Sequence, residues 1–178
     1  MVLSGKEIRK RNKSKDIVIK PYHNEQENPN SYDLLLFNEL YRYTQFPLDV
    51  TKDNPTKKII IPPTGFMLEP NILYLGRTFE YTESNTLVPR LDGKSSIARL
   101  GVVVHFTAGF GDIGFKGFWT LEIQTVHPIL IKPFMRICQI SYETIDGEYD
   151  TYHGKYQNNT EIQSSKSYLD FEKRIEKL

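Results

Sequence analysis

The chain has 178 residues, of which 39% are hydrophobic and 25% are charged, and this composition is normal for a soluble globular protein. Its length predicts one domain, residues 1–178. Lys and Arg number 23 against 22 Asp and Glu, so net charge provides no general attraction to nucleic acid or membranes. The single cysteine, Cys138, cannot form an internal disulfide, and the sequence has no apolar signal core or membrane-length apolar run. We therefore expect a cytoplasmic protein with no nucleic-acid or membrane partner.

The first predicted element is a helix near the N-terminus. Ser4 and Glu7, just before Ile8, form the capping-box pattern typical of a helix start. Six basic residues lie between Lys6 and Lys15. They could form a phosphate-binding arm, but no aromatic residue that would stack on bases is interleaved with them. We therefore favour a solvated helix face.

Most of the remaining chain has the pattern of short strands. These segments are rich in β-branched and aromatic residues and are separated by Pro, Gly, Asn or Asp. The predicted strands are 16–20, 34–37, 57–61, 72–75, 79–82, 101–106, 118–123, 128–132 and 136–142. Many short strands without long helices between them predict an antiparallel sandwich, jelly roll or barrel.

Two polar segments and the C-terminus complete the predicted elements. Segments 21–32 and 147–167 have the composition of loops. Near the end of the chain, Tyr168, Phe171, Ile175 and Leu178 recur at helical intervals. This spacing predicts a packed terminal helix rather than a membrane helix.

A glycine-rich region contains the first candidate binding residues. Six of the eleven glycines fall between Gly93 and Gly117. Two hydroxyls and two cations follow Gly93 closely, and together they could cradle a polyphosphate: Lys94, Ser95, Ser96 and Arg99. The spacing is not that of a P-loop. On these residues alone, a turn with solvated polar side chains is the favoured interpretation.

Glu122 is the sharper signal, because it lies in the apolar strand F-W-T-L-E-I. A carboxylate there must be paired, solvated from a cavity, or turned to solvent by the alternation of the strand. The cavity alternative would make Glu122 a candidate general base, and solvent exposure is an equally good interpretation. Asp112 follows Gly109 and Gly111 and is typical of turn chemistry.

The histidines do not predict a metal site. His23 and Glu25 form an H-x-E triplet, the first half of the zinc deaminase signature, but the second half needs two cysteines and the chain has one. The sequence therefore argues against zinc catalysis. His105, His127 and His153 show no ligand spacing, and we interpret them as structural.

Several motifs, in order, resemble the core of the dCTP deaminases, a family that shares its fold with trimeric dUTPases. They are G-K-S-S-I-A-R-L-G (93–101), H-F-T-A-G (105–109), D-I-G-F-K-G (112–117) and T-L-E (120–122). Segments 2–8, 17–22 and 29–34 resemble the opening of the family, and 135–139 and 152–157 its closing segment. The resemblance implies a mainly β fold, a distorted jelly roll or β-barrel of the dUTPase type, with short N-terminal and C-terminal helices.

The resemblance also implies roles for individual residues. Glu122 matches the general base and acid that activates a water to attack C4 of cytosine, assisted by Ser95 and Arg99. Asp112 matches the residue that holds the deoxyribose 3′-hydroxyl. The remaining matches would position the phosphates (Lys94, Ser95, Ser96, Arg99), meet the base (Thr120 and Leu121 through their backbone, with Gln139 nearby), or close over the triphosphate (Tyr152, Lys155, Asn159).

Active sites in this family lie between subunits, so the resemblance implies a homotrimer, with Mg²⁺ bound through the nucleotide triphosphate and no zinc. Three positions depart from the family pattern: Lys94 stands where arginine is usual, D-I-G-F replaces D-P-G-F, and Asn159 stands where glutamine is usual.

The leading hypothesis is a hydrolase that deaminates dCTP to dUTP and ammonia, supplying dUTP for thymidylate synthesis. The second is a bifunctional enzyme that also splits the triphosphate and forms dUMP and diphosphate. The third is a monofunctional dUTPase, against which stand Glu122 in T-L-E and the lack of a glycine-rich C-terminal arm. The fourth is a nucleotide-sensing protein without turnover, and the presence of Glu122, Ser95 and Arg99 argues against it.

Overall fold

The computed structural model describes residues 1–106 and 108–175, with side chains described as far as 171. The helices are α1 (Gly5–Ser14), α2 (Ser95–Ala98) and α3 (Tyr168–Ile175), with a 3₁₀ turn, η1, at Asn24–Gln26. The strands are β1 (Ile17–Lys20), β2 (Tyr32–Leu35), β3 (Glu39–Tyr43), β4 (Thr56–Ile60), β5 (Phe66–Leu68), β6 (Tyr74–Arg77), β7 (Tyr81–Ser84), β8 (Val88–Gly93), β9 (Val102–Val104), β10 (Lys116–Gly117), β11 (Thr120–Thr125), β12 (Ile129–Ile131) and β13 (Arg136–Glu143). The predicted mainly β fold with short terminal helices is confirmed.

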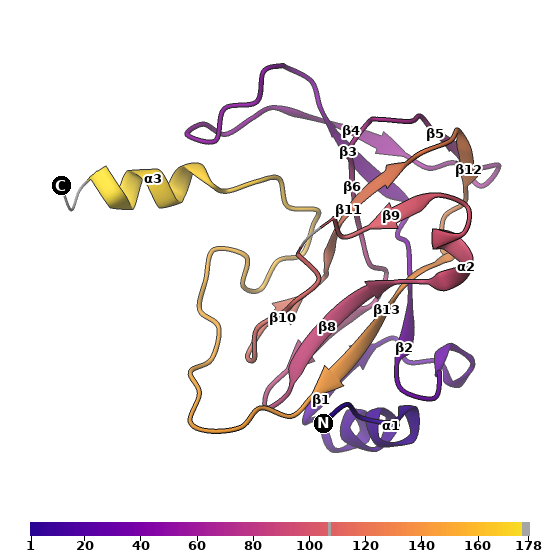
Figure 1. Ribbon diagram of the computed structural model, residues 1–178, viewed down its shortest axis with the longest axis vertical. Coiled ribbons are helices and arrows are strands. Elements are labelled where there is room, and N and C mark those ends of the chain that lie inside the picture. The colour runs from indigo at the N-terminus through magenta and orange to yellow at the C-terminus, as the bar shows by residue number, and fades with distance from the viewer. Residues whose placement is uncertain (107, 176–178) are drawn as a thin grey trace.

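The described strands form four small antiparallel sheets rather than one closed barrel. Their orders are β4-β3-β6-β11-β9, β1-β7-β10, β2-β13-β8 and β12-β5. Figure 1 shows the five-stranded sheet and the β12-β5 pair in the upper half and the β2-β13-β8 sheet below. Between them lies a continuous apolar core that draws residues from all four sheets. This arrangement leaves β11 central in its sheet, with β6 on one side and β9 on the other.

Alternation along β11 decides what reaches the surface. Leu121, Ile123 and Thr125 are buried, whereas the residues between them are partly exposed. Successive side chains on a strand point to opposite faces, so Glu122 shares the partly exposed face with Thr120. Burying Leu121 and Ile123 stabilises this register by about 2 kcal/mol each.

Each predicted strand segment overlaps an observed strand, although several are displaced by two residues. Sequence reasoning missed β3, β5, β8 and β10. In β8 the segment V-P-R-L-D-G contains a proline and two charges, which disfavour a strand. Among the described strands β8 pairs with β13 alone, and its other side meets the loop only through an isolated bridge between Arg90 and Phe110. Such an edge strand tolerates the missing N–H of Pro89.

The N-terminal helix begins as its sequence predicts, because the Glu7 N–H donates to Ser4 Oγ (3.3 Å). The C-terminal helix forms over Tyr168–Ile175 but does not pack on the sheets as we expected. It extends away from the body (Figure 1), and Phe171 is 39% exposed. Leu178, which the helical pattern included, lies outside the described residues. Among the described residues, no helix has the length and apolar character needed to cross a membrane.

Candidate active site

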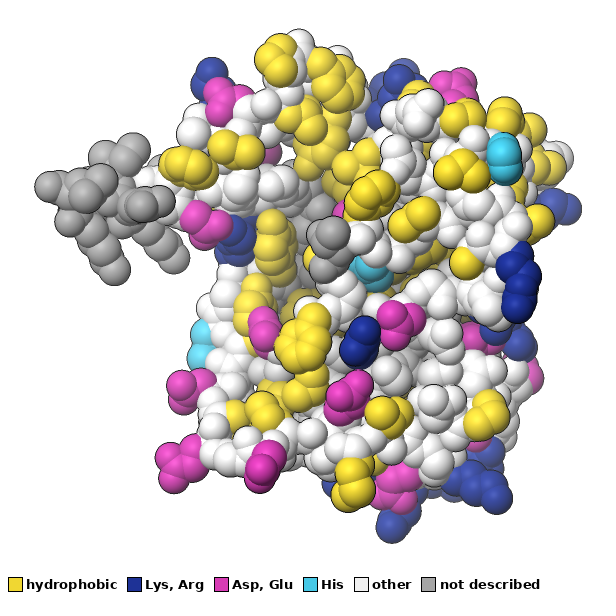
Figure 2. All heavy atoms as spheres, viewed as in Figure 1, with side chains coloured by type: hydrophobic (Ala, Val, Ile, Leu, Met, Phe, Trp, Pro, Cys, Tyr) yellow, Lys and Arg dark blue, Asp and Glu magenta, His cyan; other side chains and the backbone are white. Residues whose placement is uncertain are grey.

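A cavity of about 440 Å³ lies between β11 and the C-terminal segment, a size typical of small-molecule sites. Figure 2 shows the corresponding hollow between that segment and the body, with hydrophobic side chains along its wall. Aromatic residues supply much of the lining, and the polar groups come from the glycine-rich loop, from β11 and from the C-terminal segment: Asp112, Thr120, Glu122, Asn159, Gln163, Ser164 and Ser165.

Glu122 lies in this cavity, not in open solvent, and it has one close partner. His105 Nδ1 is 2.8 Å from Glu122 Oε2. The His105 side chain is 4% exposed and that of Glu122 is 30% exposed. An ionised carboxylate only accepts hydrogen bonds, so His105 donates from Nδ1 when Glu122 is ionised. His105 Nε2 is buried and has no hydrogen-bond partner among the described residues.

Sequence reasoning treated His105 as a structural residue, and its contact with Glu122 was missed. The contact depends on strand register: Ile123 pairs with Val104 in an antiparallel ladder, which places Glu122, just before Ile123, beside His105, just after Val104. His105 also has a φ of +58°, which turns the chain sharply after β9. No local motif signals that pairing.

Asp112 lies at the mouth of the cavity, where it begins a tight turn. The Phe115 N–H donates to the Asp112 carbonyl (3.2 Å), while no described residue hydrogen-bonds to the Asp112 carboxylate. That side chain is exposed and can accept a hydrogen bond from a ligand hydroxyl. Thr120 is also in the cavity, and its Oγ1 accepts from the Gln163 N–H (3.0 Å). The Leu121 side chain is buried in the core, so only its backbone can meet a ligand.

The candidate residues of the C-terminal segment take different positions. Tyr152 lines the cavity and packs near Phe115, with ring centroids 6.2 Å apart. Asn159 lines it too, but its Oδ1 accepts from the Phe118 N–H (2.8 Å), so it holds this segment to the body. Lys155 is not a lining residue and forms an ion pair with Asp170 of α3.

The other five candidates lie outside this cavity, around α2 and on β13: Lys94, Ser95, Ser96, Arg99 and Gln139. Figure 1 shows α2 at the right edge of the molecule and β10 with the C-terminal segment at the left. A single chain therefore presents two separate groups of candidate residues. One holds Glu122 and Asp112, and the other holds the hydroxyls and cations suited to phosphate.

The second group is organised around buried partners. Lys94 Nζ is 2.7 Å from Oδ2 of Asp33, whose side chain is fully buried. Gln139 accepts a hydrogen bond from Ser31 Oγ (2.6 Å) and donates to the Gly93 carbonyl (3.0 Å). Arg99, with the two serines before it, is exposed. Buried contacts therefore hold Lys94 and Gln139 in place, while Arg99 and the serines face solvent.

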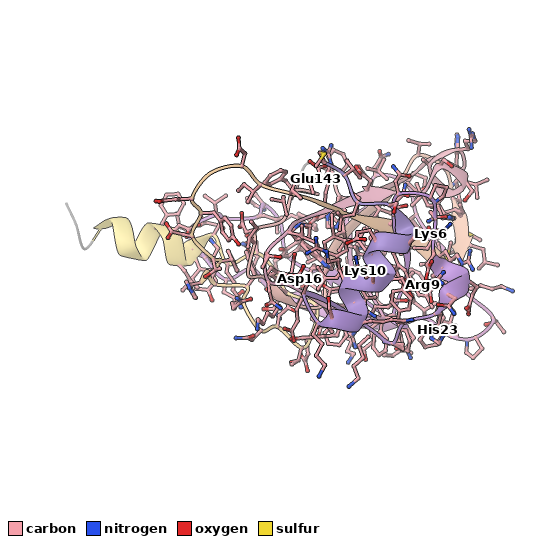
Figure 3. The ribbon with its side chains drawn as sticks, turned by 90° about the horizontal axis from the view of Figure 1, so that it is seen from below. Lys6, Arg9, Lys10, Asp16, His23 and Glu143 are labelled. Atoms are coloured by element: carbon pink, nitrogen blue, oxygen red, sulfur yellow. The ribbon has the colours of Figure 1, made fainter. Side chains whose placement is uncertain are left out.

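The basic segment and the H-x-E triplet lie apart from both groups. Figure 3 shows α1 on the face seen from below, with Lys6, Arg9 and Lys10 along it. Arg9 forms an ion pair with Glu27. His23 Nδ1 is 3.9 Å from Glu25 Oε1, and no group of three or more His, Cys, Asp or Glu placed to hold a metal occurs within the described part of the chain.

The fold and the site together define a mainly β small-molecule-binding protein, with a carboxylate at the floor of a pocket and a C-terminal segment as its cover. The family model described as dCTP deaminase-like matches residues 2–145. The chain belongs to this family.

Relatives agree with that assignment, and a solved structure shares the fold. A protein of Clostridium botulinum (strain Eklund 17B / Type B), named "dCTP deaminase, dUMP-forming", is 59% identical over 174 residues, which cover 97% of this chain and 100% of the relative. A protein of Leptospira biflexa with the same name is 57% identical over 175 residues, 98% of this chain and 100% of the relative. The crystal structure of 2′-deoxycytidine 5′-triphosphate deaminase from Agrobacterium tumefaciens has a TM-score of 0.65 at 19% identity, covering 80% of this chain and 48% of that one. It shares the fold.

Proposed function

We propose that this protein converts dCTP and two waters into dUMP, ammonia and diphosphate. From the sequence alone, dUTP was the first expectation for the product and dUMP the second. Relatives of 57–59% identity named as dUMP-forming favour the second product. The observation that carries the deamination step is the Glu122 carboxylate, held by His105 in an apolar cavity.

In the first step, Glu122 takes a proton from a water whose oxygen bonds to C4 of cytosine. The carboxyl passes this proton to N3 and then carries the proton of the new C4 hydroxyl to the exocyclic nitrogen, so that the C4–N bond breaks, ammonia leaves and C4 becomes the carbonyl of uracil. A proton shuttle needs a carboxylate of fixed orientation, and the His105 hydrogen bond fixes one of its oxygens. Asp112 is free to accept from the 3′-hydroxyl of the sugar, and the backbone at Thr120 and Leu121 can contact the base.

In the second step, a water oxygen bonds to the α-phosphorus and the bond from that phosphorus to the β-bridging oxygen breaks. The leaving diphosphate needs cations. The group that contains Lys94 and Arg99 lies away from the cavity, so we propose that a second copy of the chain supplies it. A homotrimer with sites between subunits, which the family resemblance implies, would meet this need. The nucleotide would arrive with Mg²⁺ on its triphosphate.

The test is a time course with dCTP and Mg²⁺, with the products separated by ion exchange and dUTP run as a parallel substrate. We expect dUMP, diphosphate and ammonia in equal amounts. Accumulation of dUTP, with added dUTP untouched, would establish a monofunctional deaminase instead. Cleavage of dUTP with dCTP left intact would make the chain a dUTPase.

Glu122→Gln tests the role of the carboxylate. It should still bind dCTP but lose ammonia release by roughly a thousandfold, since general acid–base catalysis contributes a factor of this order. Glu143→Gln is the matched control, because Glu143 ends β13 and does not line the cavity. Full activity in Glu122→Gln would remove Glu122 from the mechanism.

A further inference from the structure

The C-terminal segment 151–166, here called the strap, forms one wall of the cavity. Its first half is fixed to the glycine-rich loop by main-chain bonds. The Tyr152 N–H donates to the Ile113 carbonyl (2.7 Å), and the Asn158 N–H donates to the Lys116 carbonyl (2.8 Å). Gln157 adds a reciprocal pair, accepting from the Lys116 N–H (2.8 Å) and donating to the Gly114 carbonyl (2.7 Å). This half is a fixed part of the fold.

The second half is held in a different way, by one apolar side chain and by two hydroxyls. Ile162 is 4% exposed and packs against Tyr43 and Leu75 in a small cluster separate from the main core. The Ser165 N–H donates to the Tyr43 hydroxyl (3.0 Å), and the Gln163 N–H donates to Thr120 Oγ1 (3.0 Å). These contacts, here called the latch, can break without disturbing a sheet.

The latch is attached to the catalytic strand. Thr120 and Glu122 occupy the same partly exposed face of β11, and both line the cavity together with Gln163 and Ser165. A nucleotide whose base lies over Glu122 is therefore covered by the strap while the latch is closed. It can leave along this side only after the latch opens.

We propose that the latch determines which product leaves the enzyme. This inference rests on the proposed two-step function, because dUTP is then an intermediate that must stay bound until its triphosphate is split. The released fraction of dUTP depends on the rate of release divided by the sum of the rates of release and hydrolysis. Ile162 and Tyr43 keep the release rate low, so dUMP is the product.

Ile162→Ala is the decisive variant because Ile162 does not line the cavity. Removing a buried branched side chain should open the latch about thirtyfold more readily. Ile162→Val, which keeps most of the side chain, should have a small effect, about fivefold. Tyr43→Phe removes one hydrogen bond and should raise release by about fivefold. Tyr41→Phe is its control, since Tyr41 is on the same strand and its hydroxyl has no hydrogen-bond partner among the residues that the structure describes.

The measurement starts with radiolabelled dCTP and a large excess of unlabelled dUTP, so that labelled dUTP once released is not rebound. Wild-type protein should place nearly all label in dUMP. Ile162→Ala and, less strongly, Tyr43→Phe should shift label into free dUTP. This ratio does not depend on the amount of active enzyme, so partial misfolding lowers the rate without moving the ratio.

The outcomes separate the two proposals. Wild-type label found only in dUTP would overturn both the two-step function and the role of the latch. Label found in dUMP to the same extent in wild type, Ile162→Ala and Tyr43→Phe would overturn the latch alone. If Ile162→Ala does not fold, Ile162→Val, which also leaves the cavity lining unchanged, decides the question by the same ratio.

Discussion

The first half of the strap can lie against the glycine-rich loop only because Gly114 has no side chain. Gly114 has a φ of +88°, and a Cβ atom built on it would lie 2.7 Å from Thr151 Cβ and 3.0 Å from Tyr152 N. In Gly114→Ala the strap must therefore retreat. Two hydrogen bonds would be lost, from the Tyr152 N–H to the Ile113 carbonyl and from Gln157 Nε2 to the Gly114 carbonyl. Each is worth about 1 kcal/mol net, so the attachment of the strap to the loop should weaken by about 2 kcal/mol, roughly thirtyfold in kcat/KM if the cavity needs this wall.

Gly147→Ala provides the matched control. Gly147 has nearly the same φ, +87°, but nothing lies within 4 Å of the position its Cβ would take. Both variants carry the strain of a left-handed alanine, about 1 to 2 kcal/mol, whereas only Gly114→Ala meets the strap. The assay is kcat/KM for dCTP alongside the free energy of unfolding in urea. If the two variants have equal kcat/KM, the contact of the strap with Gly114 does not matter for turnover, and the predicted loss of activity is wrong.

Three further predictions concern buried polar groups. His105→Ala should lower kcat for ammonia release at least tenfold with little change in KM, and His127→Ala, exposed in the turn after β11, should not. Lys94→Ala should lower the free energy of unfolding by about 2 kcal/mol, because the buried Asp33 carboxylate loses its 2.7 Å contact with Lys94 and keeps Arg136 only at 3.4 Å; urea unfolding measures this, and an unchanged midpoint would contradict it. Burial raises the pKa of Glu80, whose two oxygens accept from Gln26 Nε2 and the Leu35 N–H. A raised pKa in the folded state means that the contribution of Glu80 to stability is fully present at low pH and is lost as pH rises through that value. Wild type should therefore lose stability relative to Glu80→Gln between pH 4.5 and pH 7. The unfolding free energy of wild type minus that of Glu80→Gln should fall over this range, and a constant value would refute the prediction.

Local patterns identified the elements whose signals lie within a few residues. The sequence predicted both the helix cap at Ser4 and the alternation in β11, because capping and strand burial depend on near neighbours. The sequence of β8 did not predict a strand. Pro89 and the charges in V-P-R-L-D-G argue against a strand until the pairing with β13 is known. The spacing in the C-terminal helix predicts its existence, but packing depends on what lies beside it, and α3 extends away from the body (Figure 1).

The candidate site divides in the same way. Asp112 and Glu122 lie only ten positions apart, one on a loop and one on the strand that follows it. A local sequence motif could therefore identify both as residues of the cavity. The contact of His105 with Glu122 depends on the register of β9 against β11, which no local motif records. The position of Lys94 and Arg99, away from the cavity, depends on the path of the whole chain.

That separation has a chemical consequence. A cavity with Glu122 but without nearby phosphate-binding cations can hold a base and a sugar, yet it gives little stabilisation to a triphosphate or to a leaving diphosphate. In the described part of this chain, the cations near the cavity are already engaged: Lys155 pairs with Asp170, Lys166 Nζ donates to the Lys155 carbonyl (3.0 Å), and Arg77 stacks on Phe118 of the cavity wall. If a second copy brings Lys94 and Arg99 to the phosphates, base chemistry and phosphate chemistry are then supplied by different subunits. A mixture of Glu122→Gln and Arg99→Ala chains, each inactive alone, should regain activity as mixed trimers form, because some sites then combine two intact halves. No recovery in mixed trimers verified by mass would place both residues in sites made by one chain.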